Sequence, residues 1–119
     1  MSETSEILRT VLERLRWAQN QGLCWFTRLN AGSIFASYTN KAGKTKGRRI
    51  KLCPEGTPDV IVIQSGDRLE HSIVTFIETK AKDGILSDAQ KQCRQDVERQ
   101  GCRYWLVKDV AQLDTLGLD

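Results

Sequence analysis

The fold of this chain is decided by one stretch, Asp59–Lys80, which reads DVIVIQSGDRLEHSIVTFIETK. Its two apolar runs, 59–63 and 73–77, are nearly continuous, and such runs are typical of strands that are buried on both faces. The residues between them, 64–72, contain a Gly-Asp pair and indicate a turn. The stretch is therefore predicted to form a hairpin of two buried strands.

The register of this hairpin determines which side chains meet. A midpoint between Arg68 and Leu69 would place Asp59 opposite Glu78, and opposed residues on antiparallel strands point to the same face. Lys80 shares that face because it lies two residues after Glu78. With this register as the working assumption, two carboxylates and one ammonium group converge at one end of an otherwise apolar hairpin.

Such a cluster indicates metal-assisted hydrolysis. Two carboxylates held close together repel each other unless a cation neutralises them, and Mg²⁺ takes one or two carboxylates while keeping several waters. Those waters can be deprotonated to attack a phosphodiester, and a nearby ammonium can orient the attacking water or contact the phosphate. The backbone carbonyl of Thr79 could supply another metal ligand. The alternative is that Glu78 and Lys80 form a solvated ion pair at a strand end, but the addition of Pro58-Asp59 favours the catalytic interpretation.

The remaining sequence predicts helices on both sides of a mixed sheet. Apolar residues at helical spacing predict an amphipathic helix over 4–20, closed near Gly22, and Ser87 begins a second helix that ends near Gly101. Three strands and a closing helix complete the prediction, at 23–30, 34–38, 104–107 and 109–116. The predicted fold class is α/β, with a central mixed sheet flanked by helices in one domain, 1–119.

The bulk composition indicates a folded cytoplasmic protein. Hydrophobic residues make up 39% of the chain and charged residues 28%, which is typical of a globular domain. No apolar run is long enough to span a bilayer, and the polar N-terminus does not resemble a secretory signal. Without an export signal we expect all four cysteines to be reduced thiols: Cys24, Cys53, Cys93 and Cys102. We expect the three tryptophans to lie in the core: Trp17, Trp25 and Trp105.

The segment Thr39–Lys51 is strongly basic and contains no acidic residue. It is predicted to form an exposed loop or a hairpin arm. So dense a group of cations favours a phosphate-binding surface, and the alternative is a loop that serves solubility. The six cations are Lys41, Lys44, Lys46, Arg48, Arg49 and Lys51.

Three motifs in this order resemble the VRR-Nuc family of PD-(D/E)xK nucleases. They are Gly56-Thr57-Pro58-Asp59, Glu78-Thr79-Lys80 and Gly84-x-x-Ser87-x-x-Gln90. Arg28-Leu29-Asn30-Ala31-Gly32 upstream and Gly101-x-x-Tyr104 downstream extend the resemblance over most of the chain. An ordered set of this kind is far more specific than any single motif. It implies a restriction-endonuclease-like core.

The resemblance also implies roles for the clustered residues. In this family the aspartate and the glutamate bind metal, and the lysine is the catalytic base or a phosphate ligand, which assigns Asp59, Glu78 and Lys80. An acidic residue on the first helix usually completes the site, and either Glu3 or Glu6 fits. The alternative is that both glutamates only interact with the positive end of the helix dipole.

The resemblance places Gln90 in the active site as well. A second explanation comes from Ser87-Asp88-Ala89-Gln90 itself, which satisfies the capping-box pattern at a helix N-terminus and needs no chemistry. Both explanations stay open at the level of sequence. Arg28 and Asn30, from the upstream motif, are expected to bind nucleic acid together with the basic segment.

The expected function is that of a Mg²⁺-dependent endonuclease acting on DNA, with Mn²⁺ as a substitute metal and no small-molecule cofactor. Free-standing VRR-Nuc proteins resemble Holliday-junction resolvases and act as homodimers, so the resemblance implies branched DNA as the substrate and a dimeric enzyme. The alternatives are a catalytically silent nucleic-acid-binding module on the same fold and a protein-interaction adaptor. The intact Asp59, Glu78 and Lys80 argue against both.

Overall fold

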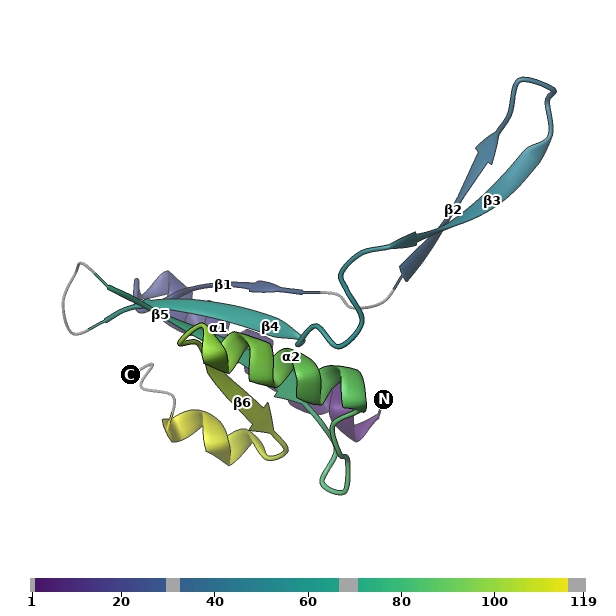
Figure 1. Cartoon of the computed structure of the whole chain (residues 1–119). Helices are drawn as coiled ribbons and strands as arrows, with labels where there is room; N and C mark the ends of the chain where they lie inside the picture. Colours follow the sequence, from purple (N-terminus) through teal and green to yellow (C-terminus); the bar gives the residue numbers. More distant parts are fainter. Residues whose placement is uncertain (1, 30–32, 67–70, 116–119) are drawn as a thin grey trace.

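The computed structural model describes residues 2–29, 33–66 and 71–115 (Figure 1). Its centre is a four-stranded sheet in the order β1-β4-β5-β6. The first three strands in this order are antiparallel neighbours, and β6 runs parallel to β5, so the sheet is mixed as predicted. The strands are β1 (Trp25–Arg28), β4 (Val60–Ser65), β5 (Ser72–Thr79) and β6 (Arg103–Val107).

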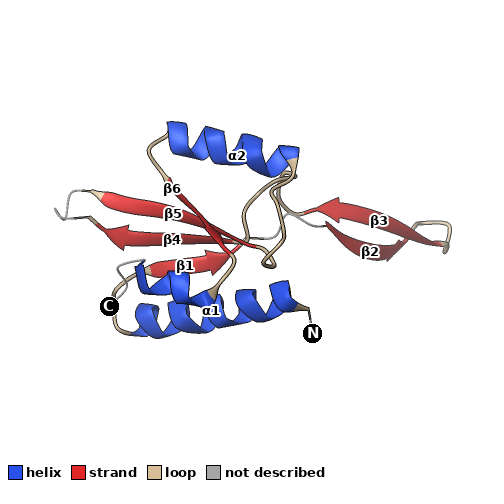
Figure 2. Cartoon of the chain, turned by 90° about the horizontal axis from the view of Figure 1, so that it is seen from below, coloured by secondary structure: helices blue, strands red, loops and turns tan. Residues whose placement is uncertain are grey.

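One helix covers each face of this sheet (Figure 2). The first is α1 (Glu3–Asn20), and the second, on the opposite face, is α2 (Asp88–Arg99). The hydrophobic core lies between α1 and the sheet, where the apolar stripe of the helix meets alternate strand residues. Its buried members are Ile7, Val11, Leu15, Ala18, Val60, Val62, Ile77, Val107 and Leu113.

The α2 face of the sheet is covered less completely. No residue of α2 is buried, and Ile61 and Ile63 of β4 are only half-buried on this side. The prediction that residues 59–63 are buried on both faces is therefore wrong for one face. The cause is that α2 is short and polar, with charged or amide side chains at most positions, so it cannot seal the surface beneath it.

Both helices begin at a serine cap. In α1 the cap is Ser2, whose hydroxyl accepts a hydrogen bond from the N–H of Ser5 at 3.1 Å, and the helix is followed by Gly22 with φ of 78°. In α2 the cap is Ser87. The predicted ends of both helices are thus correct to within a few residues.

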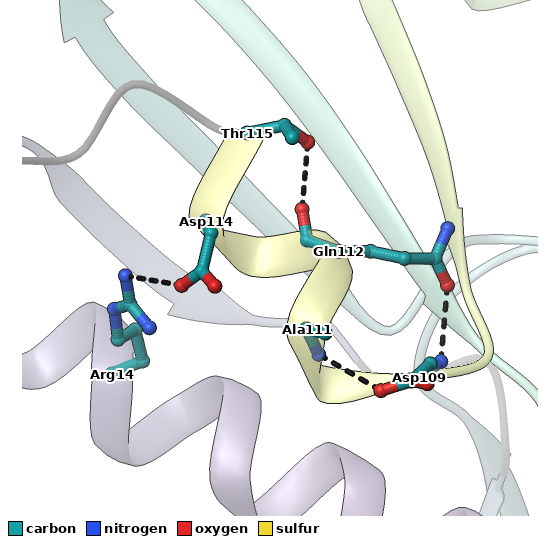
Figure 3. A network of polar contacts seen from close by, with 6 residues as sticks. All are labelled: Arg14, Asp109, Ala111, Gln112, Asp114 and Thr115. Atoms are coloured by element: carbon teal, nitrogen blue, oxygen red, sulfur yellow. Dashed lines mark hydrogen bonds and ion pairs between the residues drawn. The ribbon is translucent and has the colours of Figure 1, made fainter.

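The predicted short helix over 109–116 is present as a 3-10 helix, η1 (Val110–Thr115). The Asp109 carboxylate accepts from the N–H of Ala111 at 2.9 Å, and the Gln112 side chain accepts from the N–H of Asp109 at 3.0 Å (Figure 3). These local bonds favour tight turns over a regular α-helix. An ion pair of 3.1 Å between Asp114 and Arg14 ties η1 to α1.

The basic segment belongs to a separate two-stranded antiparallel sheet of β2 (Ser33–Thr39) and β3 (Thr45–Lys51). We call this hairpin, 33–51, the arm. It projects from the body of the molecule (Figures 1 and 2), and the radius of gyration is consequently 17.2 Å, against about 14 Å for a compact chain of this length. Of the two sequence predictions, the hairpin arm is therefore correct and the loop is wrong.

Two of the three tryptophans are not in the core, contrary to the prediction. Trp17 is 51% exposed and Trp25 is 54% exposed, whereas Trp105 is half-buried against the core. Trp25 lies on the edge strand β1, and Trp17 lies outside the apolar stripe of α1. All four cysteines are free thiols and half-buried. No helix in the described part of the chain is long and apolar enough to cross a membrane.

Candidate active site

The hairpin of β4 and β5 has the predicted register. Val60 pairs with Ile77 and Ile61 with Phe76, and the pairing continues in step to Ser65 and Ser72. One residue further along the same register, Asp59 lies opposite Glu78. The backbone carbonyl of Asp59 also accepts a hydrogen bond of 2.7 Å from the N–H of Leu29, which extends the ladder between β1 and β4 to this position.

The carboxylate of Asp59 is anchored by Thr79. Its Oδ2 accepts hydrogen bonds from the Thr79 N–H at 2.8 Å and from the Thr79 hydroxyl at 2.7 Å. Thr79 is only 2% exposed, so both bonds are protected from water. Since both bonds end on Oδ2, Thr79 leaves Oδ1 to face other partners.

The loop before Asp59 is held against α2 by a glycine. Gly56 is buried with φ of +89°, and a Cβ at this position would overlap the carbonyl oxygen of Ala89 and lie 2.6 Å from its carbon. Only glycine combines this backbone angle with so close an approach. The contact fixes Asp59 in relation to the first turn of α2, and therefore to Gln90.

Glu78 is a buried acid with one unsatisfied oxygen. The residue is 4% exposed. Its Oε1 accepts a hydrogen bond of 3.1 Å from the side-chain amide of Gln90. Its Oε2 is buried and has no hydrogen-bond partner. Burial, followed by the negative charge of Asp59, raises the pKa of Glu78 to about 7, against the lowering effects of the Lys80 charge and of the Asp59 backbone N–H. An unsatisfied buried acceptor costs roughly 1–3 kcal/mol, and either a proton or a metal cation would relieve it.

Gln90 completes the capping box and also contacts Glu78. Its side-chain oxygen accepts from the Ser87 N–H at 2.8 Å, and its own N–H donates to the Ser87 hydroxyl at 3.2 Å, which completes the capping box. Its side-chain NH₂ group meanwhile donates to Glu78. The amide therefore links the start of α2 to the buried carboxylate.

Lys80 follows β5 directly and is half-buried. Its backbone N–H donates to the carbonyl of Val107 at 3.1 Å, which holds it beside the end of β6. Its positive charge lowers the pKa of Glu78, so the ammonium lies within electrostatic reach of the carboxylate. Because Glu78 is buried, the alternative of a solvated Glu78–Lys80 ion pair is wrong.

Tyr104, which the sequence analysis placed in a motif without giving it a role, is a neighbour of this site. It pairs with Phe76 and so shares the face of Glu78. Its hydroxyl is buried without a hydrogen-bond partner; burial, followed by the charge of Glu78, raises its pKa. The Arg94 guanidinium lies 5.1 Å from the ring centroid. The alternation of residues along β6, together with the motif Gly101-x-x-Tyr104, could have identified it.

Glu3 and Glu6 lie elsewhere in this arrangement. They line a cavity of about 650 Å³ together with Lys82, Lys108 and Asp109. Within residues 2–29, 33–66 and 71–115 there is no group of three or more His, Cys, Asp or Glu side chains that could hold a metal ion. The structure thus brings Asp59 and Glu78 together but does not add either N-terminal glutamate to them.

The predicted nucleic-acid-binding residues lie in two places. Arg28 is exposed and pairs with Val60, so it points to the α1 face rather than to the carboxylates, and it lines a cavity beside Arg9 and Arg16. Asn30 and the side chain of Lys51 are outside the described residues. The other five cations of the arm are exposed: Lys41, Lys44, Lys46, Arg48 and Arg49.

We expect the metal-free protein to lose stability as the pH rises through 7. The folded-state pKa of Glu78, about 7, exceeds its ordinary value of 4.5, so folding favours the protonated acid. The resulting stabilisation is fully present below pH 4.5 and is lost as the pH rises through the folded pKa, a change on the order of 3 kcal/mol. Urea unfolding in EDTA between pH 5 and pH 8 measures it.

Glu78→Gln is the matched control for this prediction, because glutamine has nearly the same shape and stays neutral. We expect its stability to vary less with pH and to equal or exceed that of the wild type at pH 8. If the free energy of unfolding changed equally with pH in both proteins, Glu78 would not be the cause of the change.

Comparison with known proteins identifies the family. The model of the VRR-NUC domain matches residues 4–110, which is nearly the whole chain. No curated protein and no solved structure matches the chain significantly. The α/β architecture with its mixed sheet is consistent with the restriction-endonuclease-like fold of such nucleases. The chain therefore belongs to the VRR-NUC family, within the PD-(D/E)xK nuclease superfamily.

Proposed function

We propose that this nuclease-type domain is a divalent-metal-dependent endonuclease that hydrolyses phosphodiester bonds in DNA, and that residues 1–119 form one domain. The observation that carries the proposal is the buried Oε2 of Glu78, which lacks a donor, beside the anchored carboxylate of Asp59. Two carboxylates at the end of one hairpin fit a hard cation, because Mg²⁺ needs only one or two protein carboxylates and fills its remaining positions with water.

Asp59 and Glu78 would hold the metal, together with the backbone carbonyl of Thr79. Either Glu3 or Glu6 would complete the site as a further ligand; in the described residues both line a cavity with Lys82 and Lys108 and form no metal-binding group with the two carboxylates. A bound Mg²⁺ supplies Lewis acidity toward the phosphate and a water of lowered pKa. Gln90 orients Glu78 by its hydrogen bond of 3.1 Å to Oε1.

Lys80 is proposed to act on the reacting groups themselves. Its Nζ would either take the proton of the attacking water or contact the negatively charged scissile phosphate. The low exposure of the neighbouring Glu78 strengthens any charge interaction here, because water screens it weakly. Mn²⁺, which also prefers oxygen ligands, is expected to substitute for Mg²⁺.

The second candidate is a nucleic-acid-binding module without catalytic activity. This function accounts for the exposed cations of the arm. It does not explain why Glu78, with a buried Oε2 that has no hydrogen-bond partner, lies beside Asp59. DNA cleavage with Mg²⁺ and its loss in EDTA would support the enzyme. Salt-dependent DNA binding without cleavage in either condition would support the silent module.

The arm is proposed to bind phosphates without reading base edges. Replacing Lys44, Lys46, Arg48 and Arg49 by glutamine should weaken binding of duplex DNA and lower the slope of log affinity against log salt by up to about 4, since each phosphate contact releases about one counterion. Fluorescence anisotropy in EDTA at several salt concentrations measures this slope. An unchanged slope would mean that the arm does not face the DNA.

We further propose that the chain acts on branched DNA as a symmetric homodimer. One domain of this size offers one metal site, which cuts one strand at a time, whereas paired cuts in a four-way junction require two sites at a fixed separation. An isologous dimer supplies them. The exposed side chains of Trp17 and Trp25 provide apolar surface for such an interface. Leu23 is half-buried against the core and provides less apolar surface.

Light scattering at micromolar concentration tests the dimer. A cleavage panel of single strand, duplex, flap, splayed arm and four-way junction tests the substrate. A monomer that cuts flaps and ignores junctions would contradict the dimeric resolvase while supporting the nuclease.

A further inference from the structure

The arm carries an exposed aromatic ring that no contact with the body explains. Phe35 of β2 is 72% exposed, although phenylalanine has no polar atom that water could satisfy. It pairs with Arg49 across the arm. Exposing so large an apolar side chain is unfavourable relative to burial, which suggests that a partner covers it.

The ring of Phe35 is held in place by Gly47. A Cβ at Gly47 would overlap the ring, with Phe35 Cε1 at 2.5 Å and Cε2 at 2.9 Å. Gly47 pairs with Ser37, the next residue of β2 on the same face, so the ring reaches diagonally across the hairpin and lies over bare backbone. This contact covers part of the ring and leaves 72% of the residue open to solvent.

The charged residues around the ring indicate which kind of partner could cover it. Described cations lie on both faces of the hairpin, with Arg49 on the face of Phe35 and with Lys46 and Arg48 on the opposite face. The segment Thr39–Lys51 has no acidic residue. Two such arms would repel each other, which disfavours a second copy as the partner. An anionic partner that also presents a flat apolar surface fits both features.

We propose that Phe35 is a stacking platform for an unpaired DNA base. In paired DNA the faces of the bases are covered by their neighbours, so only a base outside the stack can lie on the ring. The substrate class is then DNA with at least one unpaired base beside a duplex, as in a flap or a splayed arm, whereas a fully paired four-way junction offers no such base to the ring. The inference rests on the proposed nuclease function for its biological meaning, but binding by the arm is independent of the carboxylates.

The experiment is binding in EDTA, without cleavage, to a flap oligonucleotide that carries 2-aminopurine in its single-stranded part, and to a fully paired duplex. Phe35→Leu should weaken flap binding by about 5- to 150-fold, because stacking contributes about 1–3 kcal/mol per base. It should leave duplex binding and its salt slope unchanged. Phe35→Trp should retain flap binding and the quenching of 2-aminopurine on binding, whereas Phe35→Leu should lose the quenching.

Two further variants make the test specific. Gly47→Ala leaves the ring chemically intact but displaces it, so it should weaken flap binding as Phe35→Leu does. Tyr38→Leu removes an exposed aromatic residue from the opposite face and should leave flap binding unchanged. The core contains no residue of the arm, so we expect these variants to fold. Circular dichroism checks this.

Equal effects of Phe35→Leu on flap and duplex, or no effect on either, would overturn the proposal. The proposal would also be overturned if Phe35→Leu lowered the molecular mass measured by light scattering but left flap binding unchanged. The ring would then be a contact between copies of the chain. Because binding is measured in EDTA, a failure of metal-dependent cleavage leaves this result intact, and a failure of stacking leaves the nuclease assignment intact.

Discussion

Asp59→Asn is expected to abolish DNA cleavage while leaving the fold intact. Asparagine keeps the volume, and its carbonyl oxygen can still accept the two hydrogen bonds from Thr79. It removes the negative charge that a metal requires, and a metal contributes several kcal/mol to such reactions, so the rate should fall at least about 10³-fold. Cleavage kinetics at saturating Mg²⁺, with thermal unfolding alongside, measure both quantities.

Asp83→Asn is the matched control for this variant. Asp83 is exposed in the loop that follows Lys80, so the same chemical change is made near the site without touching the carboxylate pair. We expect wild-type cleavage from it. Wild-type rates from Asp59→Asn at saturating Mg²⁺ would show that Asp59 is not a metal ligand.

Lys80→Ala is expected to abolish cleavage while metal binding persists. An ammonium does not ligate a cation, so its removal leaves both carboxylates in place, whereas losing a proton acceptor or phosphate contact costs about 10²–10⁴-fold in rate. Calorimetric titration with Mg²⁺, beside cleavage kinetics, separates the two effects. If Mg²⁺ binding disappeared together with activity, the assigned role of Lys80 would be wrong.

Lys80→Arg distinguishes the two roles proposed for this residue. Arginine keeps the positive charge but does not give up its proton near neutral pH. Partial activity in this variant would indicate a phosphate contact, and complete loss would indicate a base. Lys91→Met, at an exposed position of α2, is the control for loss of a lysine charge.

The centre of the site was predictable from sequence because it depends on local geometry. Two apolar runs around one turn fix a hairpin, and the hairpin register alone places Asp59 opposite Glu78. The capping box of Gln90 was predictable for the same reason, since it needs only four consecutive residues. Its simultaneous bond to Glu78 does not follow from local geometry, because it depends on how α2 crosses the sheet; only the family resemblance placed Gln90 near the carboxylates.

The features that the sequence did not predict depend on tertiary packing. Trp25 follows an apolar strand pattern, yet it is exposed because its strand is an edge and α2 does not seal that face. The position of Glu6 depends on how α1 crosses the sheet. The contact of Phe35 with Gly47 is diagonal across two strands, so it exists only in the observed register of the arm.

The most direct test of the account is cleavage by Glu78→Gln beside the wild type, on branched DNA at pH 8, with Mg²⁺ or with EDTA. This variant is expected to be at least as stable as the wild type in EDTA, because its side chain needs no counter-charge when buried, so lost activity would not reflect unfolding. The account predicts that the wild type cleaves with Mg²⁺ and stops in EDTA, while Glu78→Gln cleaves in neither. Wild-type cleavage that persists in EDTA, or a Glu78→Gln protein as active as the wild type, would contradict it.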